Sequence, residues 1–318
     1  MKSLNRHSLN QAYSRLEMKR RYEAWFLRFG LANGAGAWWL RYLLTNLGRG
    51  GCPGLPGAAP AQVWATWFPR EGHPETFIQE FALEALELGS TSGPLALKMG
   101  SNSIEENGCR GAIEARGTKL SWDLRYQSHF AVTLSNMGWI GFSRTPHSDA
   151  VVSGEIRFGE RMFQGAPLGM GVQGHNCGFR HRNFWTWTHA GFPQADGSIS
   201  TLEALVYEMP LGLRFRKAIL WHGGRAYVFR KLREHPRDLA ALRWAFVARS
   251  GAAILEAEID GHGASLHRLP YAKTDCSGMF EVSNNSRASA RVRVRLGKDA
   301  AFELTTDGGA VLEMTGEY

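Results

Sequence analysis

Apolar and polar residues alternate along most of the chain from residue 22 onward. YEAWFLRF (22–29) and WWLRYLL (38–44) flank the turn sequence NGAG, and VWATWF (63–68) and FIQEFAL (77–83) continue the series. Strands have this two-residue period because successive side chains point to opposite faces. Glycine in the intervening segments favours tight turns. The pattern therefore predicts strands joined by hairpins.

The later strands are predicted in pairs around glycine-containing turns. The predicted strand segments are AIEARGTKLSWDLRY (112–126), SGEIRFGERMFQG (153–165), TLEALVYEM (201–209), FRKAILWHGGRAYVFRK (215–231), RWAFVARSGAAILEAEID (243–260), FEVSNNSRASARVRVRL (280–296) and AFELTTDGGAVLEM (301–314), the last turning at Asp307-Gly308-Gly309. Helix is expected only over residues 3–19, which are amphipathic, and over a short segment at 234–243.

The strand series predicts an all-β protein of two consecutive antiparallel β-barrel or sandwich domains with few short helices. About fifteen short strands at hairpin spacing, without long crossover helices, cannot build a parallel sheet. A polar, turn-rich stretch at 143–152, SRTPHSDAVV, suggests a boundary between domains 1–150 and 151–318, the first with a short leading helix.

Composition predicts a packed core and limits the classes of binding partner that we expect. Hydrophobic residues make up 44% of the 318 residues, and the formal charge is +8. Arg291, Arg293 and Arg295 alternate with apolar residues, which is typical of a solvated sheet face, so nucleic acid is not expected as a partner. Attraction to an anionic membrane surface is an open alternative for the positive charge. The sequence leaves the oligomeric state undetermined.

The four cysteines and the first residues of the sequence give an expectation for the cellular compartment. Cys52, Cys109, Cys177 and Cys276 lie far apart without a CxxC motif, which favours free buried thiols in a reducing compartment. Residues 1–21 contain no apolar run typical of a signal peptide, and no apolar stretch reaches the length of a membrane helix. We therefore expect a cytoplasmic protein, with peripheral membrane contact left open.

Candidate chemistry gathers in GHNCGFRHRNFWTWTH (174–189). Alternation places Trp185, Trp187 and His189 on one face of a strand. Zinc is an alternative with His175, His181 and His189 as ligands, but their spacing matches no standard site, so no metal is expected. A plain core strand is a further alternative. The overlapping GMGVQG (169–174) is not followed by a helix, which argues against a dinucleotide site.

A pocket wall is the functional interpretation of the same stretch. Indole faces stabilise cations without acting as nucleophiles, and a neighbouring imidazole or carboxyl group can transfer a proton. Such a wall suits acid-initiated chemistry on an apolar polyene. The hairpin at 112–126 carries Glu114 and Asp123 on its charged face, which is usually solvated but can also line a polar pocket.

These segments also resemble a known superfamily. YEAWFLRF followed by WWLRY, then VWATWF, GCRGAIEARGTKLSWDLRY and GHNCGFRHRNFWTWTH, are similar in order to the lipocalin-like carotenoid 1,2-hydratases (hydroxyneurosporene synthases), tocopherol cyclases and fungal Diels–Alderase relatives. The resemblance covers most of residues 20–318. It implies two lipocalin-like domains, a hydrophobic ligand pocket, and cofactor-independent hydration, cyclisation or pericyclic chemistry on isoprenoid or polyketide substrates.

The resemblance carries over to His175, Trp185, Trp187 and His189. The chain departs from the pattern at Cys177, where a larger residue, often Trp, is expected. The predicted enzyme is a hydratase or intramolecular cyclase without cofactor or metal. His175 or His189 would donate or relay the proton, Glu114, Asp123 and Glu155 are the candidate carboxyl partners, and Trp25, Trp185 and Trp187 would bind substrate.

Two non-catalytic functions remain open at this point. A carrier of a lipid, pigment or other hydrophobic small molecule would use the same fold with a uniformly apolar cavity, whereas an enzyme needs convergent titratable groups. A protein-interaction module would expose its indoles.

Overall fold

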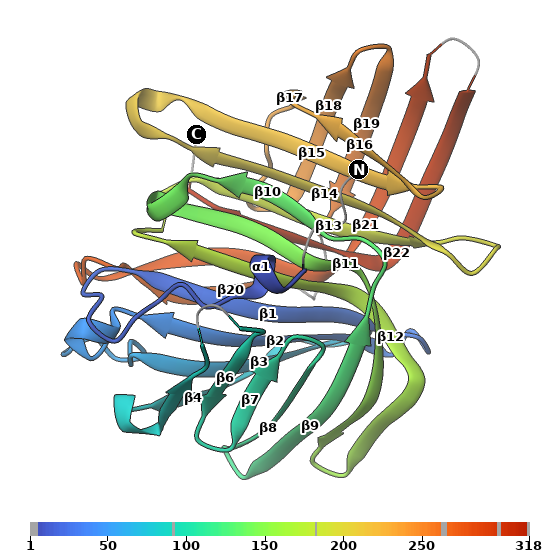
Figure 1. Cartoon of the computed structure of the whole chain (residues 1–318). Helices are drawn as coiled ribbons and strands as arrows, with labels where there is room; N and C mark the ends of the chain where they lie inside the picture. The colour runs from blue at the N-terminus through green and yellow to red at the C-terminus, as the bar shows by residue number, and fades with distance from the viewer. Residues whose placement is uncertain (1–5, 91–92, 182, 262–265, 298–299, 317–318) are drawn as a thin grey trace.

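The computed structural model describes residues 6–316 except 91–92, 182, 262–265 and 298–299, and it is built almost entirely of strands. Two large antiparallel sheets lie one above the other, with the first half of the chain in one sheet and the second half in the other (Figure 1). The predicted all-β fold of two consecutive β-domains is confirmed.

The first sheet has the order β4-β3-β2-β1-β12-β11-β9-β8-β7-β6-β5, and β10 also pairs with β11. Its strands are β1 Tyr22–Leu31, β2 Gly36–Thr45, β3 Ala61–Pro69, β4 Glu75–Phe81, β5 Leu86–Leu88, β6 Ala96–Met99, β7 Asn102–Glu105, β8 Gly108–Ala115, β9 Thr118–Gln127, β10 Val132–Asn136, β11 Gly141–Phe158 and β12 Arg161–Gly178.

The second sheet has the order β16-β15-β14-β13-β22-β21-β19-β18-β17, and β20 also pairs with β21. Its strands are β13 Trp185–Pro193, β14 Ile199–Glu208, β15 Arg214–His222, β16 Arg225–Phe229, β17 Lys231–Glu234, β18 Arg243–Ser250, β19 Ala253–Asp260, β20 His267–Ala272, β21 Met279–Leu296 and β22 Ala300–Thr315. The described helices are short: α1 Arg6–Asn10, η1 Leu47–Arg49, η2 Leu83–Ala85, η3 Gly138–Ile140 and η4 Pro210–Gly212.

The change from one sheet to the other does not fall at residue 150. That residue lies within β11, and the chain leaves the first sheet at Gly178 and enters the second at Trp185. The polar stretch 143–152 belongs to a long strand, where the pairing of β11 with β12 shifts register between Arg144 and Ala150. Such bulges let polar residues stay in a strand while it bends.

Neither predicted helix forms over its expected length. Within the described residues, helix α1 ends at Asn10, because the Glu23 carboxylate accepts the backbone N–H groups of Tyr13 at 2.8 Å and Ser14 at 2.6 Å. Residues 235–242 form turns closed by reciprocal backbone hydrogen bonds between Asp238 and Arg243. None of the described helices is long and apolar enough to cross a membrane.

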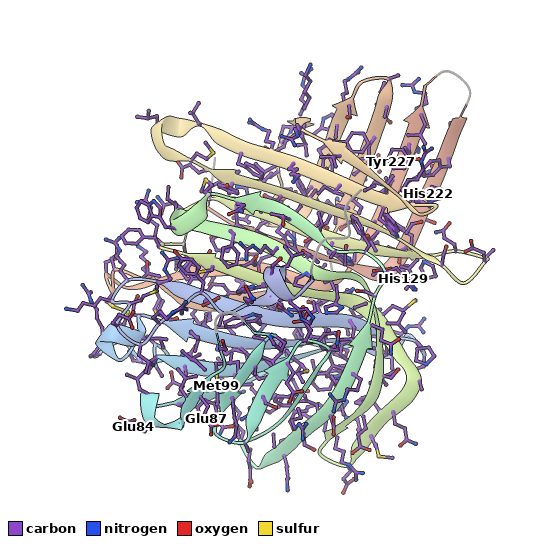
Figure 2. All side chains as sticks on the ribbon, in the orientation of Figure 1. Glu84, Glu87, Met99, His129, His222 and Tyr227 are labelled. Carbon is purple, nitrogen blue, oxygen red and sulfur yellow. A yellow bond between two sulfur atoms is a disulfide. The ribbon has the colours of Figure 1, made fainter. Side chains whose placement is uncertain are left out.

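Three apolar cores fill the molecule, one inside each sheet and one between the sheets, and side chains occupy all three (Figure 2). β1 shows why three are needed. Trp25, Leu27 and Phe29 enter the core of the first sheet, whereas Ala24 and Phe26 enter the core between the sheets. A strand buried on both faces needs a nearly continuous apolar sequence, and the run AWFL (24–27) supplies it in place of the alternation expected for this segment.

The glycines of GMGVQG allow β12 to pack closely against β1. A Cβ atom at Gly171 would lie 1.8 Å from the carbonyl oxygen of Arg28, and one at Gly174 would lie 2.2 Å from the Phe26 ring. These glycines therefore have a packing role.

Arg28 joins the two sheets at a bulge. The predicted turn at Asp307–Gly309 is not present: β22 runs through these residues, but its pairing with β21 jumps from Ala288↔Ala310 to Ala290↔Thr306. The Arg28 guanidinium donates to the carbonyl oxygens of Gly308 and Gly309, both at 3.1 Å, and of Ala310 at 2.8 Å. It also donates twice to Ser286, once at 3.0 Å from Nε. Burial lowers the pKa of Arg28 to about 9, with a smaller contribution from the nearby charge of Arg287.

A disulfide joins the sheets at another point. Cys52 and Cys276 are bonded, across 224 residues of sequence, whereas Cys109 and Cys177 are free and buried. The expectation of four free thiols is therefore wrong for this pair. The sequence could not predict this disulfide, because the two cysteines are distant in the chain and meet only when the two sheets are stacked.

We expect Arg28→Met to lower the free energy of unfolding by at least about 3 kcal/mol, because several buried carbonyl oxygens lose a charged donor. Arg249→Met, at an exposed position of β18, is the matched control and should change stability by less than about 0.5 kcal/mol. Urea denaturation measures both. Equal effects of the two variants would contradict the role given to Arg28.

Candidate functional site

A cavity of about 130 Å³ opens between the two sheets. Its walls come from strands β1, β2, β10, β11 and β12 on one side and from β13, β14, β20 and β22 on the other. We call this space the chamber. A volume of this size accommodates a ring-sized apolar group, as a 150 Å³ cavity accommodates benzene.

A wider hollow of about 380 Å³ adjoins the chamber, and we call it the vestibule. Arg180 and His181 line both spaces. The vestibule is more polar, with Lys273, Asp275 and Glu281 also in its wall. Arg180 and His181 therefore lie at the boundary between the two spaces.

The apolar part of the chamber consists largely of aromatic rings. Phe26 and Trp187 meet edge to face at 5.4 Å between ring centroids, and Phe26 and Trp39 meet in the same way at 6.5 Å. The other apolar side chains of the wall are Tyr22, Ala24, Met137, Ile140, Phe142, Trp185, Leu205 and Tyr207. Such a wall excludes water and offers ring faces to a cation.

An acid and a base that are largely removed from water both line this space. Glu313, on β22, lies directly opposite Trp187 in the sheet, and its Oε1 accepts a hydrogen bond from Trp185 Nε1 at 2.9 Å. Arg41, on β2, is only 6% exposed. Burial raises the pKa of Glu313, and the positive charge of Arg41 opposes part of that rise. Burial therefore favours the protonated form of the Glu313 carboxyl group.

Arg41 is surrounded by aromatic rings. Its Cζ lies 4.3 Å from the ring centroid of Tyr271 and 5.4 Å from that of Trp64. Arg41 Nη1 and the Tyr271 hydroxyl are buried without a hydrogen bond of ordinary geometry to any described residue. The hydroxyl nevertheless lies close enough to Arg41 and Glu313 for both to affect its pKa, which burial raises.

His181 completes this polar group. Its ring stacks on Tyr22 at 3.9 Å between centroids, and both ring nitrogens are buried without a partner among the described residues. Burial lowers the pKa of His181 to about 3, so the imidazole is neutral near pH 7. A neutral imidazole offers one N–H donor and one acceptor. Arg41, His181, Tyr271 and Glu313 are hereafter called the polar cluster.

The predicted site residues separate into those that line the chamber and those that do not. Trp185 and Trp187 line it. His175 is buried elsewhere, where Nδ1 donates to the carbonyl oxygen of Leu9 at 2.8 Å and Nε2 lies 2.7 Å from Glu23. Trp25 stacks on His175 and donates to the carbonyl oxygen of Asn10. His175 and Trp25 thus hold the N-terminal segment in place.

His189 lies in the junction between the sheets, outside the residues that line the chamber. Its Nε2 donates to the carbonyl oxygen of Ser148 at 2.7 Å, and burial lowers its pKa to about 3. The three histidines of the zinc alternative therefore have separate sets of neighbours: Glu23 and Leu9 for one, Tyr22 for another, and Ser148 for the third.

The three predicted carboxyl partners do not reach the chamber. Glu114 and Asp123 are exposed on the outer face of β8 and β9. Glu155 is 42% exposed and pairs with Arg157 at 3.1 Å. Alternation correctly places these residues opposite the apolar face, but that polar face of the hairpin is solvated.

Arg41, Tyr271 and Glu313 are not among the predicted site residues, and His181 is a candidate only in the zinc alternative, although the sequence carries a signal for Arg41 and Glu313. Arg41 interrupts WWLRYLL and Glu313 interrupts AVLEM, each as the one charged residue of an apolar run. A charge in a strand buried on both faces is costly unless it has a partner or a function.

Glu203 is a further buried carboxyl directly behind this wall. Its Oε1 accepts hydrogen bonds from Thr145 at 2.7 Å and from Trp187 Nε1 at 3.1 Å, while Oε2 has no partner among the described residues. Burial raises the pKa of Glu203 to about 7. Glu203 therefore fixes the orientation of the Trp187 indole from outside the chamber.

Comparison with known proteins supports the fold. No family model matches the chain, and no curated protein matches it. The structure is similar to that of CghA crystallised with Sch210972, with a TM-score of 0.64 and 9% identity over 94% of this chain and 89% of that one. It is also similar to kievitone hydratase from Nectria haematococca (TM-score 0.55, 10% identity, 97% of this chain and 94% of that one).

A third similar structure is a putative AttH from Nitrosomonas europaea, with a TM-score of 0.51 and 14% identity over 96% of this chain and 95% of that one. The resemblance inferred from the sequence is thereby confirmed for the fold, over nearly the whole chain.

We expect Glu203→Gln to remove one component of the pH dependence of stability. Because the pKa rises from an ordinary 4.5 to about 7, the folded protein retains a proton that the unfolded chain releases. The stability from that proton is fully present below pH 4.5 and is lost as the pH rises to about 7. Relative to the parent, the variant should therefore gain up to about 3 kcal/mol across this window.

Unfolding free energies from urea titrations at several pH values measure this difference. The buried histidines titrate in both proteins, so their contribution cancels in the difference. Curves that stay parallel from pH 4.5 to 7 would show that Glu203 is not protonated in the folded protein.

Proposed function

We propose that the protein is an enzyme that requires no cofactor and acts on a hydrophobic isoprenoid or polyketide polyene in the chamber, adding water or closing a ring. The observation that carries this proposal is a carboxyl group, Glu313, that lines an aromatic cavity together with Arg41 and whose pKa is raised by burial. A hydrophobic pocket with a few convergent titratable groups is typical of an active site.

Glu313 is the proposed proton donor. Proton transfer from its carboxyl group to the substrate would leave a carboxylate, and the positive charge of Arg41 would stabilise that carboxylate. Trp185 Nε1 already donates to Oε1, which fixes the orientation of the group and further stabilises its ionised form. Burial thus favours the protonated form of Glu313, and the neighbouring donors lower the free energy of the carboxylate that forms when the proton leaves.

The aromatic wall would stabilise the positive charge that develops on substrate carbon. Trp39, Trp187 and Phe26 present ring edges and faces to the chamber without a nucleophilic atom. Hydration would follow if water attacks the cation, and cyclisation would follow if a double bond of the substrate attacks it first. In either case the resulting oxonium ion or cyclic cation would release a proton, which would return to the Glu313 carboxylate. Kievitone hydratase, one of the similar structures, is a hydratase by name, which supports the first outcome.

The geometry favours this proposal over the two non-catalytic functions. A carrier is expected to have a uniformly apolar lining, but the chamber contains the polar cluster. An interaction module is expected to expose its indoles, but Trp187 is 8% exposed and Trp185 is half-buried. The roles of His175 and His189 in proton transfer stay predictions, and their positions outside the chamber make Glu313 the better candidate.

Location and partners are also part of the proposal. A small hydrophobic molecule is the proposed partner, and nucleic acid is not, because Arg291 and Arg293 pair with Glu303 at 3.0 and 2.9 Å. Peripheral membrane contact stays a prediction. The Cys52–Cys276 disulfide favours an oxidising compartment over the cytoplasmic location expected from the sequence.

We expect Glu313→Gln to reduce turnover by about 10²- to 10⁴-fold, because glutamine accepts the Trp185 hydrogen bond but cannot donate a proton as an acid. The assay incubates the purified protein with linear polyenes and prenylquinols and follows product mass. A gain of one water mass indicates hydration, and a new product of unchanged mass indicates cyclisation.

Glu114→Gln, on the solvated face of the β8–β9 hairpin, is the matched control and should retain parental activity. The catalytic proposal fails if Glu313→Gln and Glu114→Gln turn over substrate equally well. Ligands that bind and are recovered unchanged with the parent protein would instead indicate a carrier.

A further inference from the structure

We infer that the natural ligand of the chamber is a hydrophobic carboxylate, whose anionic group is bound by Arg41 and Tyr271 while its hydrocarbon part contacts the aromatic wall. This inference rests on the same site as the proposed function, but it concerns recognition rather than catalysis. The inference specifies the polar group of the ligand, which the proposal of a polyene substrate leaves open.

The charge of Arg41 is not compensated within the described chain. Arg41 makes no ion pair with a described residue, and its guanidinium lies over the rings of Trp39, Trp64 and Tyr271. Glu313 is the nearby carboxyl group, but the two side chains form no ion pair, and burial raises the pKa of Glu313 and so favours its neutral form. A buried cation without a counter-ion is costly, and a bound anion removes that cost.

Several hydrogen-bonding groups converge on the same end of the chamber, and the described residues leave part of their hydrogen-bonding capacity unused. Arg41 Nη1 and the Tyr271 hydroxyl make no hydrogen bond of ordinary geometry to the described residues, and neither do the two ring nitrogens of His181. Buried polar atoms in a native protein normally have partners. The two oxygens of a carboxylate can accept from Arg41 and Tyr271 together, and the N–H of a neutral imidazole can add a third hydrogen bond.

The vestibule would favour the entry of an anion. Its two acidic side chains already face cations outside it: Asp275 lies 3.6 Å from Arg20, and Glu281 lies 3.6 Å from Arg268. Arg180 and Lys273, in the same wall, make no ion pair with a described carboxylate. A positively charged entrance raises the local concentration of an anionic ligand.

The remainder of the chamber suits a hydrocarbon. Phe26, Trp187 and Leu205 belong to the apolar core between the sheets and also line the cavity. The carboxylate and the apolar part would thus be bound by different ends of one space. This arrangement places the acidic group beside Glu313, where its negative charge would further favour the protonated form of that carboxyl.

The test compares a conjugated polyene fatty acid, parinaric acid, with its methyl ester. Both absorb where tryptophan emits, so quenching of protein fluorescence measures binding of either without turnover. At pH 7 we expect the parent protein to bind the acid at least about tenfold more tightly than the ester, because the ester lacks the anionic charge.

Three variants identify the source of that preference. Arg41→Met should abolish the preference while leaving ester binding within about twofold of the parent. Tyr271→Phe should reduce the preference, and Arg41→Lys should retain part of it, because lysine keeps the charge but not the planar fork. Arg249→Met, on the exposed surface, should behave as the parent.

Equal binding of acid and ester by the parent protein overturns the inference without the need for any variant. Failure of the parent to bind either probe overturns it as well, as does a preference that survives in Arg41→Met. A variant that fails to fold is recognised by its thermal transition, and the decision then rests on the parent and Arg41→Lys.

The two proposals fail in different ways. A preference for the acid without turnover of any polyene would refute the catalytic proposal and support this one. Turnover of neutral polyenes by a parent protein without the preference would refute this inference and leave the catalytic proposal standing. Glu313→Gln separates them within one protein, since it should keep the preference for the acid and lose turnover.

Discussion

The buried guanidinium of Arg28 is the interaction on which the arrangement of the two sheets depends. It projects from β1 of the first sheet and donates to backbone carbonyl oxygens of β21 and β22 in the second. Those oxygens are free because the β21–β22 ladder is interrupted by a bulge. A buried cation and unpaired carbonyl groups would each be costly alone, and here each removes the cost of the other.

The chamber lies between two places at which the sheets are joined. Tyr22, Ala24 and Phe26 line the chamber, and Arg28 follows next on the same face. At the other end the Cys52–Cys276 disulfide, together with a hydrogen bond from Asn46 Nδ2 to the carbonyl oxygen of Thr274 at 3.0 Å, joins the two sheets. The sheets are thus held together on both sides of a segment whose side chains do not fill the space between them.

Much of this fold could be predicted from the sequence, because a period of two and glycine turns are local signals. The predicted β1–β3 series and the hairpin at 112–126 correspond to observed strands. The bulge at Asp307–Gly309 has the composition of a turn, and its geometry depends on Arg28, which is distant in the chain. Alternation correctly placed Trp185 and Trp187 on the same face of their strand. It could not show that the strand face carrying Glu114 meets solvent, whereas the strand face carrying Arg41 meets the other sheet.

Glu23, Arg28 and Arg41 are charged residues in apolar strands, and they differ in whether the described residues complete their hydrogen bonds. Glu23 accepts from Tyr13 and Ser14 and contacts His175, and Arg28 donates from all its nitrogens, so both act within the architecture. Arg41 has a buried nitrogen without a partner among the described residues, and it lines the chamber. Both arginines are removed from water, but the protein supplies the compensating groups for Arg28, whereas we propose that a ligand supplies them for Arg41. For these two arginines, that difference separates a joint between the sheets from a binding site.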